Sequence, residues 1–335
     1  MSLLRQTFLF QTCVASALAI VGFTGCSTPS ANQTSPPISA ASPIATPTAA
    51  ANSPRVVATN SVLCDLARQI AANTINLICL IKPGTDAHVY QVTPDDRKAI
   101  ETANLVLYGG YNFEPSLTKL IQATSNSASK VAVNEVAVPN SQTFEEDGKT
   151  ETDPHVWHNA QNGVQIARVI QNNLAKVAPT HADLYAKNAQ AIATQLTQID
   201  GWIKSQIATI PPAARKLVTT HDALGYYSKA YNIPIEGALE GINTEAKPTA
   251  ARVKTLVNTV TSAKVPTIFA EVSINPQLIQ TVAREANVKV SEQELYTDGL
   301  GEPGSNGETY QKMLTANTQA IVEGLGGQFT AFRAK

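Results

Sequence analysis

The chain has 335 residues, 43% of them hydrophobic and 15% charged, which is enough for one large or two ordinary domains with a buried core. Lysine and arginine total 25 and aspartate and glutamate total 26, a balance that argues against a nucleic-acid-binding protein. After the N-terminal segment, no apolar run approaches the roughly 20 residues that a membrane-spanning helix needs. Only five histidines and four cysteines are present, so any metal site must be drawn from a short list.

Residues 1–25 have the pattern of a secretory signal peptide, in which a basic residue precedes a short apolar stretch and small residues. The Gly25-Cys26 pair resembles a bacterial lipobox, although Phe23 stands where an aliphatic residue is usual. We therefore predict lipidation of Cys26, with an ordinary signal peptide and a nearby structural cysteine as the alternative. Residues 26–53 are rich in Pro, Ser, Thr and Ala and carry no charge, which predicts a disordered tether.

From residue 54 onward, short β-branched runs alternate with segments of helical periodicity, which predicts βαβ units and parallel sheets. The predicted strands are 55–60, 75–81, 104–108, 130–133, 216–219, 233–236, 267–271 and 288–290. The predicted helices are 61–72, 94–102, 114–124, 221–231, 248–263, 276–286 and 308–324. Two α/β lobes are therefore expected, an N-terminal lobe at 54–179 and a C-terminal lobe at 211–335.

Residues 180–210 are expected to link the two lobes. From Ala182 to Ile210 the sequence has no proline and a single glycine, Gly201, and apolar residues recur at helical spacing. One continuous helix here would be about 43 Å long and would act as a stiff strut. Two ordinary helices broken near Gly201 are the alternative.

Three of the five histidines adjoin the ends of predicted elements. His88 follows a predicted strand, His155 precedes a helix, and His221 follows strand 216–219 and opens the next predicted helix. Ligands of open α/β sheets bind at the carboxyl ends of strands, and histidine is the commonest metal ligand. Asp298 follows the last predicted strand in a glycine-rich segment. Three imidazoles and a carboxylate would suit Zn²⁺ or Mn²⁺ rather than Ca²⁺, but the spacing alone leaves ordinary solvated or core histidines as the alternative.

Four motifs stand in order along the chain: Lys82-Pro83-Gly84 with His88-Val89-Tyr90, Asp153-Pro154-His155-Val156-Trp157, His221-Asp222-Ala223-Leu224-Gly225-Tyr226, and Phe269-Ala270-Glu271 leading towards Asp298. Together they resemble the manganese- and zinc-binding solute-binding lipoproteins of ABC importers, from about Arg55 to the C-terminus. The resemblance implies two α/β lobes, each a mostly parallel sheet flanked by helices. One long rigid helix would join the lobes, and the metal would lie in the cleft between them.

The resemblance also implies a ligand set of His88, His155, His221 and Asp298, two residues from each lobe. His158 and His181 are not expected among the ligands, although an accessory role for His158 stays open. Glu245 is a candidate for hydrogen bonding a ligand ring, with a solvated loop glutamate as the alternative.

The function that the resemblance implies is high-affinity capture of a divalent transition metal and its delivery to an ABC importer permease with a cytoplasmic ATPase. The protein would be a monomer held by its lipid anchor at the membrane, in the periplasm or on the outer face, and would not be an enzyme. The alternative is a secreted zinc-dependent hydrolase, but neither a His-Glu-x-x-His nor a Gly-x-Ser-x-Gly motif occurs in the sequence.

The transported cargo is predicted to be Mn²⁺ or Zn²⁺, with manganese favoured. A histidine at the position of His221 occurs in both zinc and manganese carriers of the family. The segment Val138–Thr152, however, lacks the histidines that zinc carriers often have there. Of the remaining cysteines, Cys64 and Cys79 lie on adjacent predicted elements, and either a disulfide or two buried thiols is expected.

Overall fold

The computed structural model describes residues 53–146 and 149–334. The predicted signal peptide, the tether up to Asn52 and the predicted lipidation site Cys26 lie outside these residues. Within the described residues, no helix has the length and apolarity that crossing a lipid bilayer requires.

The first half of the described chain builds a parallel sheet with the strand order β2-β1-β3-β4. Its strands are β1 (Arg55–Ala58), β2 (Asn76–Cys79), β3 (Leu105–Tyr108) and β4 (Ser129–Ala132). In the central strand β1, Val56 and Val57 are fully buried, as expected for a parallel strand that is covered on both faces. The register places Val57 beside Ile78 of β2 and Val106 of β3.

Helices alternate with these strands as predicted. They are α1 (Ser61–Ala71), α2 (Pro94–Glu101), α3 (Pro115–Ala123) and the short α4 (Val133–Ala137), which was not predicted. Local side-chain bonds set the starts of two of them. Asn60 accepts a hydrogen bond from the Leu63 backbone N–H at the start of α1, and Thr93 and Asp96 form a reciprocal capping box at the start of α2.

The segment Val138–Thr152, for which no strand was predicted, contains two antiparallel strands, β5 (Thr143–Glu146) and β6 (Lys149–Thr152). Just before β5, the Gln142 backbone N–H donates to the Tyr226 hydroxyl of α7 (Gly225–Tyr231), so this part of the chain contacts an element beyond the linking helix. The lobe boundaries at 179 and 211 stay a prediction.

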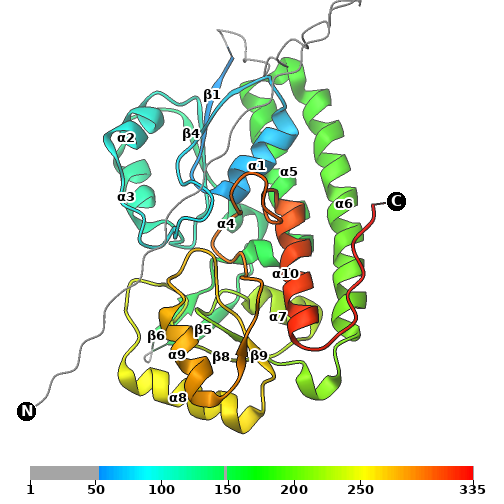
Figure 1. Ribbon diagram of the computed structural model, residues 1–335. Helices are drawn as coiled ribbons and strands as arrows, with labels where there is room; N and C mark the ends of the chain where they lie inside the picture. Colours follow the sequence, from blue (N-terminus) through cyan, green and yellow to red (C-terminus); the bar gives the residue numbers. More distant parts are fainter. Residues whose placement is uncertain (1–52, 147–148, 335) are drawn as a thin grey trace, which may run out of the picture. The chain divides into compact units, whose positions relative to one another are not determined.

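Two long helices follow, α5 (Ala160–Val177) and α6 (Ala182–Ala208), and they lie side by side (Figure 1). Short 3-10 turns precede α5, separate it from α6 and follow α6, at Val156–His158, Pro179–His181 and Pro212–Ala214. The predicted linking helix is one continuous helix of 27 residues, about 40 Å long. It runs through Gly201, so the break suggested as the alternative does not occur. A Cβ at this position would meet nothing within 4 Å, so the glycine carries only its modest helix-propensity penalty.

After α6, the strands form two parallel pairs. β7 (Leu217–Thr219) pairs with β8 (Ile235–Ala238), and β9 (Thr267–Ile268) pairs with β10 (Lys289–Val290). A hydrogen bond from the Phe269 backbone N–H to the Val218 carbonyl connects the two pairs. The helices of this part are α7, α8 (Ala250–Ala263), α9 (Gln277–Ala286) and α10 (Tyr310–Gly324). The fold is therefore the predicted α/β arrangement of parallel sheets flanked by helices around one long helix.

Helix α10 packs against α1 of the first half of the fold and against the long helix α6 (Figure 1). Tyr310 at the start of α10 is fully buried and lies against Gly163 of α5, where a Cβ would overlap its hydroxyl. Its hydroxyl donates to the Trp157 carbonyl. A second, smaller core lies under α8 and α9 and includes Leu256, Val260, Ile279 and Val282.

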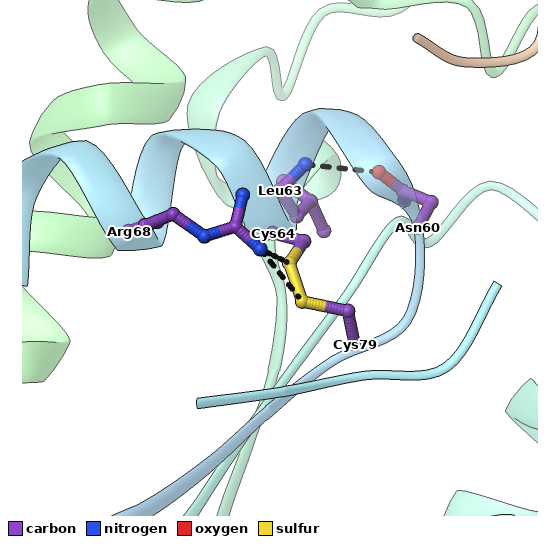
Figure 2. Close-up of a disulfide and its surroundings, with 5 residues drawn as sticks. All are labelled: Asn60, Leu63, Cys64, Arg68 and Cys79. Carbon is purple, nitrogen blue, oxygen red and sulfur yellow. Dashed lines mark hydrogen bonds between the residues drawn. A yellow bond between two sulfur atoms is a disulfide. The ribbon is translucent and has the colours of Figure 1, made fainter. Parts of the chain in front are cut away.

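Cys64 of α1 and Cys79 of β2 form a disulfide with a Cα–Cα distance of 5.7 Å (Figure 2). The Arg68 guanidinium lies over both sulfurs, 3.2 Å from Cys64 Sγ and 3.5 Å from Cys79 Sγ. Of the two expectations for this cysteine pair, the structure shows the disulfide.

Candidate metal centre

Four side chains from four separate parts of the chain converge on one point. One ligand atom of each of His88, His155, His221 and Asp298 lies within 4.8 Å of all the others, and all four residues are buried. Asp298 Oδ1 lies 3.5 Å from His88 Nε2, 3.4 Å from His155 Nε2 and 3.1 Å from His221 Nε2. The structure therefore brings together the whole predicted ligand set.

The carboxyl ends of the parallel strands carry these residues towards one another. His88 lies in the segment after β2, His221 follows β7, and Asp298 follows the isolated parallel bridge between Glu271 and Leu295. His155 stands immediately before the 3-10 turn that leads into α5. His88 and His155 come from before α6, and the other two come from after it, so the cluster lies between the two lobes.

His221 does not open a helix as predicted, because α7 begins only at Gly225. The backbone groups of His221 are engaged elsewhere. Its N–H donates to Glu271 Oε1 at 2.9 Å, and its carbonyl accepts from the Thr219 hydroxyl at 2.8 Å. The residues between β7 and α7 form an irregular turn, and these two bonds hold His221 within it.

Carboxylates behind two of the rings fix which ring nitrogen faces the cluster. Asp153 Oδ1 accepts from both the backbone N–H and Nδ1 of His155, each at 2.9 Å. Glu271 accepts from both the backbone N–H and Nδ1 of His221. With Nδ1 protonated and donating, neutral His155 and His221 each direct an Nε2 lone pair inwards, which is the tautomer that a metal ligand needs.

Asp86 gives a related support to the first histidine. Its Oδ1 accepts from the His88 backbone N–H at 2.9 Å, and its Oδ2 accepts from the Thr244 hydroxyl at 2.5 Å. Thr244 lies after α6, so this carboxylate joins segments from both halves of the fold next to the cluster.

The wall of the cluster is apolar and aromatic. The fully buried Phe113 ring stands edge-on to His88 and His155, with centroid distances of 5.1 and 5.7 Å. Trp157 packs on Phe113 at 4.7 Å and on His155 at 5.4 Å. These rings exclude water from one side of the cluster and strengthen the electrostatic interactions inside it.

The arrangement is electrostatically incomplete without a positive charge at its centre. His88 Nε2 and His155 Nε2 are only 3.2 Å apart, so in the tautomers that a metal ligand needs their two lone pairs repel one another and the Asp298 carboxylate. Among the described residues, neither His221 Nε2 nor Asp298 Oδ1 has a well-directed hydrogen-bond partner. A cation bound by all four atoms, or protons in its place, would satisfy them.

The pKa shifts of these residues show the same need for a positive charge in the buried cluster. Burial alone would lower the pKa of His221, but the negative charges of Asp298 and Glu271 raise it well above its usual value. Burial would raise the pKa of Asp298, yet the charge on His221 and the close approach of the three histidine rings hold it well below its usual value. Burial likewise opposes protonation of His155, and the hydrogen bond to Asp153 together with the nearby Asp298 carboxylate raises its pKa above the usual value.

The other histidines and Glu245 lie outside this convergent set. His158 is fully buried and its Nε2 is 2.9 Å from the Thr297 carbonyl; burial and the neighbouring His155 lower its pKa to about 3. His181 is exposed at the start of α6, and Glu245 is exposed in its loop. Glu271, rather than the sequence candidate Glu245, supports the His221 ring.

Asp153 and Glu271 lie within the four motifs, but the sequence pattern assigns a role to neither of them. A signal for Asp153 is present in the sequence, because Asp86 and Asp153 each stand two residues before a histidine of the cluster. Glu271 lies 50 residues from His221, and no local pattern joins them.

Comparison with known proteins shows the family to which the chain belongs. The family profile described as zinc-uptake complex component A, periplasmic, matches residues 56–324. The chain belongs to this family. Among its relatives, the metal ABC transporter substrate-binding lipoprotein ScbA of Streptococcus cristatus is 35% identical over 277 residues, covering 81% of this chain and 88% of the relative. The manganese ABC transporter substrate-binding lipoprotein PsaA of Streptococcus mitis is 34% identical over 278 residues, covering 81% and 89%.

A solved structure supports the same fold. The periplasmic zinc-binding protein TroA from Treponema pallidum superimposes with a TM-score of 0.77 at 30% identity, covering 82% of this chain and 99% of TroA. ScbA and PsaA are thus named as substrate-binding components of ABC transporters for a metal and for manganese, and TroA is described as a zinc-binding protein.

Proposed function

We propose that this protein captures a divalent transition metal outside the cytoplasm and delivers it to the membrane permease of an ABC importer. The observation that carries the proposal is the convergence of His88, His155, His221 and Asp298 on one point, all four buried. Three imidazole nitrogens and one carboxylate oxygen form a donor set that suits Mn²⁺ or Zn²⁺. Relatives that are named as substrate-binding components of metal ABC transporters support the delivery step.

Capture and release suit this site better than catalysis. Four protein ligands would fill all four coordination positions of a tetrahedral cation. A catalytic zinc instead keeps one coordination position open for water or substrate. The hydrolase alternative gains no support from the comparisons, since ScbA and PsaA are named as components of ABC transporters. We infer that the protein is not an enzyme.

We propose Mn²⁺ as the cargo. The segment before His155 forms the polar antiparallel strands β5 and β6 and contains no histidine that could compete for zinc. A relative from Streptococcus mitis is named for manganese, while TroA is named for zinc. Because almost any site of this kind binds Zn²⁺ more tightly than Mn²⁺, supply and geometry must decide the cargo in the cell.

We further propose that lipidated Cys26 anchors the mature protein as a monomer at the outer face of the membrane. Relatives named as lipoproteins support this location. The intact mass of the mature protein checks the anchor: acyl chains on an N-terminal Cys26 are expected, and a free thiol there would contradict it.

The deciding experiment measures metal content in protein purified from its own compartment by mass spectrometry, alongside binding titrations with Mn²⁺ and Zn²⁺. The His221→Ala variant should lose most of its metal binding. The control variant His181→Ala, which makes the same change at an exposed histidine, should bind metal as the wild type does. Zinc alone in the native protein would overturn the manganese assignment. Wild-type protein that binds neither metal would overturn the proposed function.

A further inference from the structure

Thr297 makes hydrogen bonds to residues on both sides of the metal centre. Its hydroxyl donates to Glu271 Oε2 at 2.9 Å, and Glu271 is the carboxylate that holds the His221 ring. Its carbonyl lies 3.1 Å from Trp157 Nε1 and 2.9 Å from His158 Nε2. The side chain is 1% exposed, so these bonds form away from water.

The two donors to the carbonyl belong to the 3-10 turn that follows His155. Trp157 and His158 are buried, and the Trp157 carbonyl accepts from the Tyr310 hydroxyl at 2.6 Å, which fixes the turn against α10. One peptide carbonyl after α6 is therefore held by two ring N–H groups from before α6. The turn carrying His155 and the segment carrying Asp298 cannot shift separately without breaking these bonds.

The position of Thr297 next to Asp298 completes the connection. Asp298 Oδ2 accepts from the Ser273 hydroxyl at 3.1 Å, which leaves Oδ1 towards the three histidines. Trp157 and His158 hold the Thr297 carbonyl, and Ser273 holds Asp298 Oδ2. Together these bonds direct Asp298 Oδ1 towards the three histidines. Thr297 thus hydrogen-bonds to Glu271, which holds the His221 ring, and to the turn Val156–His158, which follows His155. It is also the chain neighbour of Asp298.

His158 has a chemistry that fits the role of a fixed donor. Its Nε2 donates to the Thr297 carbonyl, which requires the tautomer with a bare Nδ1, and Nδ1 has no hydrogen-bond partner among the described residues. Leaving a buried ring nitrogen unpaired costs free energy, so the Nε2 bond is formed at the expense of the other nitrogen.

We propose that Thr297 is a positioning residue of the metal centre, which holds three of its four ligands in one geometry through the Glu271 carboxylate and the Trp157–His158 turn. This inference rests on the proposed metal-binding function. Partners behind the ligands of metal sites typically contribute about 10- to 100-fold in affinity, and the Thr297 hydroxyl should contribute within this range.

The test compares Thr297→Val, which removes only the hydroxyl in a side chain of similar shape, with Thr297→Ser, which keeps it. Affinities for Mn²⁺ and Zn²⁺ are measured by competition with a chelating dye, and the absorption spectrum of bound Co²⁺ reports the ligand geometry. Thr318→Val is the matched control, because Thr318 is equally buried on α10 and its hydroxyl bonds only to Leu314 and Tyr227 in the contacts found for it.

We expect Thr297→Val to lose about 10-fold or more in affinity and to change the Co²⁺ spectrum, and Thr297→Ser to restore both. Thr318→Val should alter stability alone. The double variant of Thr297→Val and Glu271→Gln should lose less than the sum of the single losses, since both changes act on one hydrogen bond. Trp157→Phe tests the carbonyl side of the network if Thr297→Val does not fold, and it should also weaken binding.

Normal affinity and an unchanged spectrum in Thr297→Val, or in Trp157→Phe where that variant is needed, would overturn the inference while the proposed function stands. Wild-type protein that binds neither Mn²⁺ nor Zn²⁺ would overturn the proposed function and this inference with it.

Discussion

Glu271 accepts two hydrogen bonds from His221, one from the backbone N–H and one from Nδ1, and both residues are buried. One carboxylate therefore fixes the backbone position, the ring orientation and the tautomer of a proposed ligand. A buried anion behind an imidazole also makes its Nε2 a stronger donor to a cation.

Glu271→Gln should accordingly weaken metal binding about 10- to 100-fold while leaving the fold intact. The amide keeps the shape of the side chain but has one acceptor oxygen in place of two, so it cannot hold both N–H groups of His221. Titration against a chelating dye gives the affinity, and circular dichroism checks the fold. Glu245→Gln, at an exposed loop glutamate, should bind normally; an equal loss in both variants would contradict the role of Glu271.

Thr244→Val should release bound metal faster. The Thr244 hydroxyl donates to Asp86, whose other oxygen holds the His88 backbone, so this bond joins the two sides of the cluster. Loss of a hydrogen bond worth about 1 kcal/mol corresponds to roughly fivefold in rate. Stopped-flow mixing of loaded protein with excess chelator measures the rate. Thr261→Val, which removes a hydroxyl bonded only within α8 in the contacts found, should release metal at the wild-type rate.

The metal-free protein should lose stability as the pH rises because of Glu114. Burial raises the pKa of Glu114 above its usual 4.5, although hydrogen bonds from Thr59, Asn60 and the Gly109 N–H oppose the shift. The folded state therefore binds this proton more tightly than the unfolded state. The contribution of Glu114 to the free energy of unfolding is greatest below pH 4.5 and is lost as the pH rises through the raised value.

Urea denaturation of the metal-free protein from below pH 4.5 to neutral pH measures this effect. Glu114→Gln stays uncharged, so the stability of the wild type relative to the variant should fall across this range. Asp65, whose pKa burial also raises, is present in both proteins and cancels in the difference. A difference between the two proteins that is constant with pH would contradict the prediction.

Removal of the disulfide should destabilise the fold without affecting the metal centre. Cys64 and Cys79 are 15 residues apart, and closing a loop of this length stabilises a protein by about 3 kcal/mol in the chain-entropy account. We expect a loss of about this size in the double variant Cys64→Ala and Cys79→Ala, with unchanged Mn²⁺ affinity. A thiol count on denatured, unreduced protein should find neither cysteine free, and two free thiols would refute the bridge.

Much of the fold could be predicted where local pattern and tertiary environment agree. The apolar runs of β1 and β3 are buried strands, and the apolar spacing of α6 matches a helix that packs on α5. The strands near α8 and α9 are shorter than predicted, as β9 ends at Ile268, because Phe269 bonds across to Val218 and the chain then turns towards Glu271.

Other elements depend on contacts that no local pattern contains. The segment of α5 is rich in Asn and Gln, so the sequence indicated a helix after His155 without giving its bounds, and in the structure its buried face packs on α1 and α6. The four proposed ligands could be named because motifs mark them, whereas the roles of Phe113, Thr297 and Glu271 arise from partners far along the chain. These contacts between distant residues form only in the folded protein, so no local sequence pattern predicts them.

The fit of Tyr310 against Gly163 has a consequence for how this sequence can drift over evolutionary time. A methyl group at position 163 would occupy the space of the phenol, so the tyrosine could persist only beside glycine. Descendants that acquire alanine or a larger residue at 163 should carry a smaller residue at 310 and a different anchor for the turn after His155. The two positions should therefore covary when sequences of the family are compared.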